Sequence, residues 1–146
     1  MYYREMLQED IPIVTKMYVE TFNSPPWNDV WTEETAGKRL MQMISCEEAY
    51  GLLAYEDYLL CGMALGCTEQ FITETMFDLK EFCVRNDMRS HGIGSLLLEE
   101  LERRLKGMGV GSICLFTSGG KGIDVFYQKR GYETYSEMVM MGKKLN

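Results

Sequence analysis

Long apolar runs are missing from this sequence of 146 residues. No stretch approaches the roughly 20 apolar residues that a membrane-spanning helix needs. The opening Met-Tyr-Tyr-Arg-Glu-Met also lacks the apolar core of a signal peptide. We therefore expect no membrane segment and a cytoplasmic protein. Because no Pro/Ser-rich linker, repeat or low-complexity tract divides the chain, we expect one domain over residues 1–146.

Spacings typical of metal or disulfide centres are also missing. His91 is the only histidine, and no two cysteines are spaced as C-x-x-C. Most of the cysteines fall in apolar runs, as reduced thiols of a hydrophobic core do; they are Cys46, Cys61, Cys67, Cys83 and Cys114. We expect neither a zinc site nor a disulfide framework.

Basic residues are outnumbered, since 15 Lys and Arg face 22 Asp and Glu and the net charge is −7. Binding to nucleic acid or to an anionic membrane is therefore not expected. The charge is unevenly spread: residues 1–84 hold 5 basic and 15 acidic side chains, whereas residues 85–130 hold 8 and 5. This pattern favours an anion at the middle of the chain and a cation at the front, unless the charges only solvate the surface.

The hydrophobic pattern predicts a mixed fold with a real core, since 46 % of the residues are hydrophobic and 25 % are charged. We expect an α+β (or three-layer α/β) protein, written βααββββαβαβ, whose mostly antiparallel sheet lies between helices. The expected strands are 2–6, 50–55, 58–67, 76–85, 112–117 and one or two within 131–143. The expected helices are 10–22 (capped by Asp10), 32–44 (capped by Thr32), 93–107 and 123–130.

A glycine-rich turn between the predicted strand 76–85 and the helix from Ile93 is the most informative segment. It reads Arg89-Ser90-His91-Gly92-Ile93-Gly94. Glycines let the backbone approach a ligand, and the free N–H groups at a helix start attract phosphate. A tight turn alone would also explain both glycines. A dinucleotide fingerprint would need Gly or Ala where Leu97 stands, and a P-loop needs Gly-Lys before Ser or Thr, which never occurs.

This turn resembles the acetyl-CoA signature R/Q-x-x-G-x-G/A of the GNAT superfamily of N-acyltransferases. The preceding Glu81–Met88 is similar to the family's fourth strand and its lead into the turn, and Phe126–Tyr132 is similar to its F-Y-x-K-x-G-F/Y segment. The resemblance implies a GNAT-like fold with acetyl-CoA as co-substrate and no metal. The coenzyme-binding residues that it implies are Phe82, Cys83, Val84, Arg89, Ser90, His91, Gly92, Ile93, Gly94, Ser95 and Lys129. The loop Thr117–Gly122 departs from the family, which often has an Asn there.

The same resemblance implies catalytic roles. Tyr127 would protonate the departing thiolate, and a backbone N–H near Val84 would hold the carbonyl oxygen. Glu81 is the candidate base, directly or through water, and Asp78 is a second candidate on the opposite face of the strand. Alternatively, Tyr127 packs beside Phe126 and the carboxylates only face water or ion pairs. We expect His91 to act through its backbone, and no covalent route through Cys83, which has no histidine partner in any motif.

The acceptor site is expected at the first two helices and the loop between them. Trp27, Asp29 and Trp31 combine aromatic faces with a carboxylate, which suits a cation, although they would equally suit packing and solvation. Residues 22–32 also resemble aminoglycoside N-acetyltransferase-like members. The predicted reaction is direct acetyl transfer, in a ternary complex, to the primary amine of a cationic small molecule. The alternatives are a peptide or protein amine, or a noncatalytic acyl-CoA-binding module. A homodimer is compatible with the apolar run 138–141.

Overall fold

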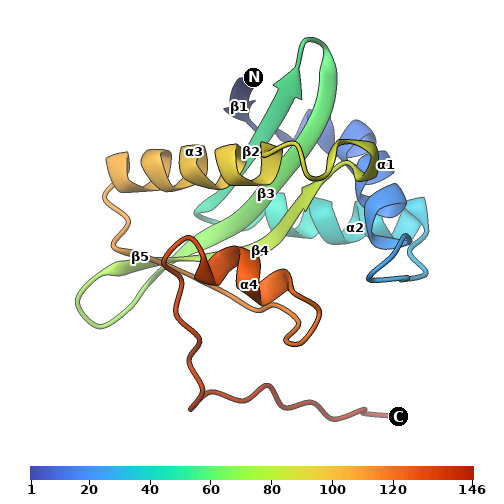
Figure 1. Ribbon diagram of the computed structural model, residues 1–146. Coiled ribbons are helices and arrows are strands. Elements are labelled where there is room, and N and C mark those ends of the chain that lie inside the picture. The colour runs from blue at the N-terminus through green and yellow to red at the C-terminus, as the bar shows by residue number, and fades with distance from the viewer. The chain divides into compact units, whose positions relative to one another are not determined.

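One five-stranded sheet organises residues 1–116 of the computed structural model, which describes residues 1–146 (Figure 1). The strand order is β1-β2-β3-β4-β5, antiparallel from β1 to β4, with β5 parallel to β4. The strands are β1 (Tyr2–Glu5), β2 (Ala49–Glu56), β3 (Leu59–Gln70), β4 (Thr75–Val84) and β5 (Ser112–Leu115). The parallel pair needs a crossover, which α3 (Ile93–Gly107) provides.

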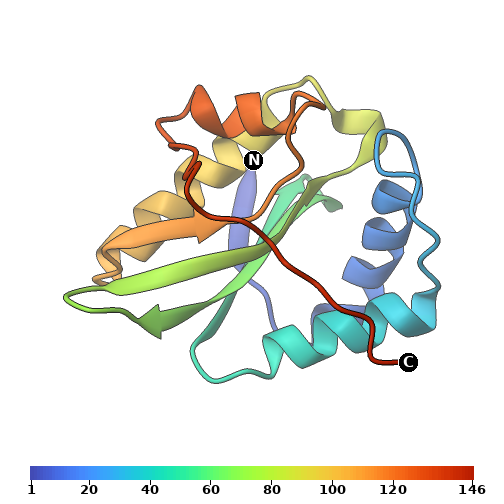
Figure 2. The same cartoon turned by 90° about the horizontal axis from the view of Figure 1, so that it is seen from below.

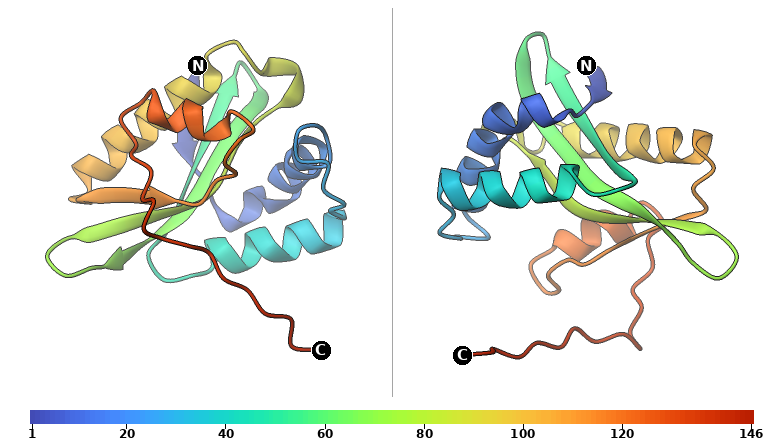
Figure 3. Two further views of the ribbon diagram at one scale, coloured as in Figure 1. Left: turned by 60° about the horizontal axis from the view of Figure 1, so that its bottom comes forward. Right: turned by 180° about the vertical axis from the view of Figure 1, so that it is seen from behind.

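Helices cover both faces of this sheet. α1 (Ile11–Phe22) and α2 (Glu33–Ile44) lie together on one face and α3 lies on the other (Figures 2 and 3). The amphipathic spacing of these helices explains the arrangement, because their apolar stripes become the core. The buried set on the first face includes Val14, Tyr18, Leu40, Leu53, Met63 and Cys83. The buried stripe of α3 consists of Ile93, Leu97, Leu98, Leu101 and Leu105.

The structure confirms the predicted N-terminal cap of one helix but not that of another. The Thr32 hydroxyl accepts the Thr35 N–H at 3.0 Å, which confirms the predicted start of α2. Asp10 precedes α1 but makes no such cap. Its carboxylate instead accepts the Leu7 N–H at 2.7 Å and two Arg4 nitrogens at 2.6 and 2.8 Å, within a short 3₁₀ turn, η1 (Gln8–Asp10). The ion pair between the buried Asp10 and the partly exposed Arg4 takes the place of the cap.

A register shift interrupts the pairing of β3 with β4. Leu65 pairs with Glu81, but the next residue, Gly66, pairs with Leu79, so β4 carries one extra residue. A Cβ on Gly66 would lie 2.0 Å from the carbonyl oxygen of Asp78, and only glycine fits there. Such bulges twist a strand and re-aim its side chains. The irregularity comes immediately before Glu81.

Residues Thr117–Asn146 form a second compact unit. Its helix is α4 (Ile123–Gln128), which begins after Gly122 at a φ of +78°. The strands expected within 131–143 do not form. Met138, Val139, Met140 and Met141 are 71 to 87 % exposed, and the apolar run makes no ladder of backbone hydrogen bonds. A run of consecutive apolar residues without alternation does not specify one buried face.

The predicted fold class is confirmed, and the element order is corrected at two points. Besides the missing last strand, three strands and not the four of the written order separate α2 from α3; the expected ranges 50–55, 58–67 and 76–85 correspond to β2, β3 and β4. A short 3₁₀ turn, η2 (Asn86–Met88), links β4 to the glycine turn. No helix has the length and apolar character needed to cross a membrane.

Candidate active site

Glu81 occupies a core position of β4. Buried and less buried residues alternate along this strand, and Phe77, Leu79, Glu81 and Cys83 are the buried ones. Directly paired residues of neighbouring strands share a face, so Glu81 (opposite Leu65) and Cys83 lie on the face covered by α1 and α2. The bulge puts Phe77 and Leu79 on the other face. Glu81 is only 6 % exposed. The strand therefore places a carboxylate where its pattern calls for an apolar side chain.

Two donors from two helices hold the Glu81 carboxylate by the same oxygen. The Arg39 Nε of α2 donates to Oε1 at 2.7 Å, and the Tyr18 hydroxyl of α1 donates to Oε1 at 3.1 Å. Oε2 accepts no hydrogen bond. The only fully buried side-chain oxygens or nitrogens without a partner are the hydroxyls of Thr15 and Thr21, so Oε2 retains contact with solvent. One oxygen is anchored and the other is available.

The electrostatic environment makes Glu81 a better proton acceptor than an exposed glutamate. Burial raises its pKa, and nearby Asp29 raises it further, whereas the hydrogen bonds from Arg39 and Tyr18 and the charge of Arg39 oppose the rise. The net direction is upward. Burial and the Glu81 charge also raise the pKa of Tyr18, which keeps its hydroxyl a donor. A base in contact with both water and a fixed donor pair can take up a proton.

The predicted acceptor residues Asp29 and Trp31 lie beside this cluster. The Trp31 ring is 5.4 Å from the Tyr18 ring and the Arg39 guanidinium lies 5.8 Å from the centre of the Trp31 ring. The Trp31 Nε1 donates to Asp29 Oδ2 at 3.2 Å. The expected mixture of aromatic face and carboxylate is therefore assembled. A cation, the side chain of Arg39, already lies against the Trp31 ring.

Trp27 joins the acceptor loop to the glycine turn. Its ring lies 5.0 Å from Phe22 and 4.8 Å from the Arg89 guanidinium. Arg89 Nη1 also donates to the Pro25 carbonyl at 3.0 Å, and Nη2 donates to Asn86 Oδ1. The Arg89 guanidinium thus contacts the loop between α1 and α2. Its side chain serves the turn by anchoring it, and its backbone remains available for the predicted phosphate contact.

Part of the β4 edge has no neighbouring strand. β5 pairs with β4 only from Met76 to Leu79, so the later residues of β4 have β3 on one side alone. The Arg85 N–H donates to the Cys61 carbonyl of β3 at 2.8 Å. Because N–H directions alternate along a strand, those of Phe82 and Val84 point away from β3. The predicted oxyanion donor near Val84 therefore lies on the edge of β4 that faces away from β3, beyond the residues that β5 pairs with, and an extended pantetheine arm suits the same edge.

The glycine turn has the geometry of an anion site. Gly92 precedes α3 at a φ of +79°, and a Cβ there would meet no atom within 4 Å. The first N–H group that bonds back within α3 is that of Leu96, which donates to the Gly92 carbonyl. The N–H groups of Ile93, Gly94 and Ser95 come before it, at the start of the helix. Ser90, at a φ of +67°, and His91 are exposed. The open backbone at the positive end of the α3 dipole fits a pyrophosphate.

The other β4 candidates are less suited to proton transfer. Asp78 was expected on the opposite face from Glu81, but it pairs with Cys67 of β3 and the bulge returns it to the same face. It pairs with the Lys80 ammonium at 3.9 Å and lies where β5 covers the strand edge. Burial raises the pKa of the Cys83 thiol well above its usual range, which keeps that sulfur protonated and poorly nucleophilic. No group of three or more His, Cys, Asp or Glu side chains is arranged to hold a metal ion.

Tyr127 and Lys129 belong to the second unit. Tyr127 lies on α4, with its ring 5.0 Å from Phe126 and 5.5 Å from Tyr132. Ring packing, one of the two roles considered for Tyr127, is therefore present, and its role as an acid stays a prediction. Lys129 is exposed at the C-terminal end of α4.

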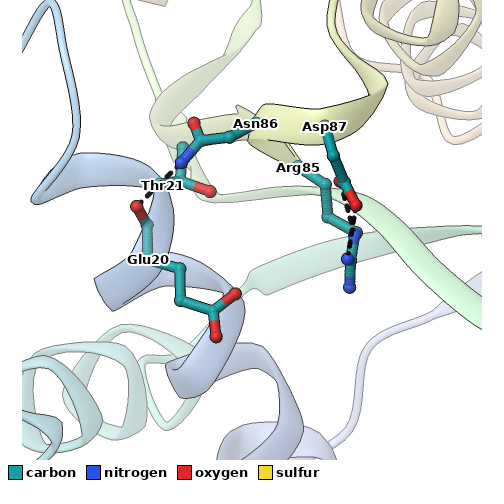
Figure 4. A pocket seen from close by; sticks show the side chains of 5 residues that line it. All are labelled: Glu20, Thr21, Arg85, Asn86 and Asp87. Atoms are coloured by element: carbon teal, nitrogen blue, oxygen red, sulfur yellow. Dashed lines mark hydrogen bonds and ion pairs between the residues drawn. The ribbon is translucent and has the colours of Figure 1, made fainter.

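A small pocket of about 130 Å³ lies where α1 ends and β4 runs into η2 (Figure 4). Its lining residues are Glu20, Thr21, Arg85, Asn86 and Asp87. Figure 4 shows Arg85 paired with Asp87, at 2.8 and 3.0 Å, and Asn86 Nδ2 donating to the Glu20 carbonyl at 2.9 Å. Glu81 does not line this pocket. Arg85, Asn86 and Asp87 already have partners, although the Thr21 hydroxyl has none, so we assign the chemistry to the Glu81 cluster.

Tyr18 and Arg39 are the partners of Glu81 that the sequence did not identify. Arg39 and Glu81 itself each carried a signal. Arg39 stands three residues after Ala36 and four before Met43, both of the apolar stripe of α2, which puts it on the face directed at the sheet. Glu81 shares the phase of Phe77 and Cys83 in the alternating strand. A buried carboxylate needs a donor, and an arginine on a core-facing stripe is such a donor.

Comparisons with known proteins agree with this architecture. Residues 47–134 match the model of an acetyltransferase (GNAT) domain. A possible acetyltransferase from Clostridium difficile superposes with a TM-score of 0.84 at 9 % identity, covering 99 % of this chain and 98 % of that one. A GNAT family acetyltransferase from Staphylococcus aureus gives 0.74 at 17 % identity, covering 99 and 98 %. An aminoglycoside acetyltransferase from an uncultured soil metagenomic sample gives 0.75 at 13 %, covering 99 and 96 %.

No curated protein matches the sequence significantly. The GNAT model nevertheless covers more than half of the chain, and the solved structures share its fold over nearly their whole length. The chain therefore belongs to the GNAT acetyltransferase family, as the glycine turn and its flanking segments predict. Acetyl transfer is the class of reaction that this membership indicates.

Proposed function

We propose that this protein is an acetyl-CoA-dependent N-acetyltransferase that acts on the primary amine of a cationic small molecule by direct attack in a ternary complex. The observation that carries the proposal is the buried Glu81 carboxylate, which has one anchored oxygen and one open oxygen. It lies on β4 three residues before Val84, on the strand whose edge β5 leaves free. A base and an oxyanion donor on one strand are the two groups that amide formation needs first.

The residues of the chain would divide the work as follows. The glycine turn and the first N–H groups of α3 would hold the pyrophosphate, and the β4 edge that faces away from β3 at Phe82 and Val84 would hold the pantetheine arm. Acetyl-CoA supplies the thioester whose carbonyl carbon the amine attacks. Glu81 Oε2 takes the proton lost by the acceptor nitrogen as the C–N bond forms. The Val84 N–H stabilises the carbonyl oxygen, and Tyr127 gives its hydroxyl proton to the thiolate as the C–S bond breaks.

The acceptor side favours a cation. Residues 1–84 contribute 5 basic and 15 acidic side chains, and Asp29 lies close enough to Glu81 to raise its pKa. The Trp31 ring already lies 5.8 Å from the Arg39 guanidinium, an example on this face of the attraction between an aromatic ring and a positive group. One structural relative is named an aminoglycoside acetyltransferase. Amines of that polycationic kind suit the charge and the aromatic rings of this face.

Glu81→Gln tests the assignment of the base. We expect turnover to fall by about 10²- to 10⁴-fold, the usual contribution of general acid–base catalysis. Release of free CoA thiol, followed with polyamines, aminoglycosides and simple amines, measures this loss. Affinity for acetyl-CoA should be unchanged. The matched control is Asp78→Asn, which neutralises the other β4 carboxylate and should retain most of the activity. Full turnover by Glu81→Gln, with every acceptor that the parent uses, would refute the role.

A further inference from the structure

We propose that Tyr18 and Arg39 are positioning residues that hold Glu81 by Oε1 and thereby leave Oε2 as the oxygen that accepts the proton. This inference rests on the proposed function, since it assigns partners to the base named there. Nothing in the family resemblance points to either residue. The geometry does, because α1, α2 and β4 each contribute one member of the cluster.

The two hydrogen bonds together define the orientation of the carboxylate. With a single hydrogen bond the carboxylate could still rotate about that hydrogen bond. A bidentate arginine, by contrast, would occupy both carboxylate oxygens. Here the 2.7 Å bond from Arg39 Nε and the 3.1 Å bond from the Tyr18 hydroxyl converge on Oε1. The carboxylate group is symmetric, so whichever oxygen meets the donors, the other one is left open. The open oxygen is the one in contact with solvent.

Glu81 and Arg39 are buried to different extents, which suits a carboxylate that changes charge during a reaction. The Glu81 side chain is 7 % exposed, whereas the Arg39 side chain is 44 % exposed. Removing one charge from a fully buried pair leaves the other charge without solvation, at a high cost. When Glu81 takes up a proton, the Arg39 guanidinium keeps water on its exposed side and the Trp31 ring on another. Protonation of Glu81 therefore leaves no isolated charge in the core.

Glu81 is the member of the cluster whose charge changes with pH in the working range, because its neighbours keep their protonation states. The charged or titratable groups that face it are Tyr18 from α1, Arg39 from α2, Asp29 from the loop and Cys83 from β4. Burial raises the pKa of both Tyr18 and Cys83, so both stay protonated in the working range. Arg39 keeps its charge at every such pH. Asp29 raises the pKa of Glu81 by its charge, while Arg39 and Tyr18 lower it.

A carboxyl ¹³C NMR titration measures the effect directly, without turnover. The Glu81 signal, assigned by its loss in Glu81→Gln, is followed against pH in the parent, Arg39→Met and Tyr18→Phe. Loss of an opposite charge or a donor should move the Glu81 midpoint upward, by about one pH unit or more in Arg39→Met. The acidic limb of kcat/KM should move in the same direction. Arg39→Lys, which keeps the charge, should show a smaller upward shift of the Glu81 midpoint than Arg39→Met.

Matched variants control for general effects. Lys38→Met removes the same charge from an exposed neighbour on α2, and Tyr55→Phe removes a hydroxyl that binds Arg4 beside the Arg4–Asp10 ion pair. Neither should move the Glu81 midpoint. Melting curves identify any variant that loses the fold, and Tyr18→Phe, which keeps its ring, then carries the test alone.

Two distinct results separate the inference from the function on which it rests. An unchanged Glu81 midpoint in folded Arg39→Met and Tyr18→Phe would overturn the inference, whatever the activity. A shifted midpoint together with full activity of Glu81→Gln would retain the hydrogen-bonded cluster but overturn Glu81 as the base, and with it the catalytic meaning of the cluster. A shifted midpoint, a shifted acidic limb and an inactive Glu81→Gln are the outcome that we expect.

Discussion

Gly92→Ala should separate the phosphate-binding role of the glycine turn from its role in the fold. Gly92 has a φ of +79°, and a Cβ built on it meets no protein atom within 4 Å. The cost to the protein is then only the left-handed backbone, about 1–2 kcal/mol for a residue with a Cβ. That cost lowers the melting temperature by about 2–8 °C in a chain of this length. The variant should remain folded at room temperature.

The cost to acetyl-CoA binding has a different origin. The open space in front of Gly92 is where a phosphate would approach the backbone, so a methyl group there keeps at least one N–H from its oxygen. A hydrogen bond to a charged group contributes about 1.5–3 kcal/mol. We therefore expect acetyl-CoA affinity to fall by about 10- to 150-fold, measured by calorimetry.

Gly109→Ala is the matched control for this experiment. Gly109 lies beyond the other end of α3, with a φ of +84° and no atom within 4 Å of a built Cβ. It should lose as much thermal stability as Gly92→Ala and none of the acetyl-CoA affinity. Equal affinity for acetyl-CoA in both folded variants would refute the assignment of the pyrophosphate to the turn.

Two further predictions concern the acid and the acceptor. Tyr127→Phe keeps the ring that packs on Phe126 and removes the hydroxyl, so folding and acetyl-CoA binding should persist while single-turnover rates fall by about 10²-fold; an unchanged rate would leave Tyr127 with a packing role alone. Reversing the charges of Asp29, Glu33 and Glu34 to lysine should raise the acceptor KM and weaken its salt dependence, while the same reversal at Glu9, Glu47 and Glu56 should not. A preferred acceptor that is neutral or anionic would contradict this expectation.

The parts of the fold that could be predicted from the sequence are those determined by neighbouring residues. Thr32 caps α2 because its hydroxyl reaches a backbone N–H three residues away, and α3 begins at Ile93 as the glycine turn indicates. The alternation along β4 likewise predicts which of its residues are buried, although the bulge divides them between the two faces of the sheet. Each of these signals acts within one element, so the sequence contains all of the information that it needs.

The missed features depend on contacts between different elements of the fold. Arg39 meets Glu81 across 42 positions, and Tyr18 meets it across 63. Asp10 binds Arg4 of β1 where a helix cap was expected. In each case a tertiary partner outcompetes the local rule, because a charged partner offers a stronger hydrogen bond than a backbone N–H does. The strand predicted at the apolar run 138–141 does not form for a different reason: apolar character alone does not make a strand without backbone hydrogen bonds to another strand.

At Glu81 the residue present differs most from the apolar residue that the alternation along β4 predicts for a buried position. An apolar residue would continue the buried series of Phe77, Leu79 and Cys83 at no electrostatic cost. Because the pKa of Glu81 is raised in the folded state, its ionised form destabilises the fold relative to its protonated form. Its contribution to stability therefore falls as pH rises from the pKa of the unfolded chain to that of the folded chain, and stays low above it. Positions that break a local rule at the expense of stability are those where function is expected. The open oxygen of Glu81 indicates which function that is.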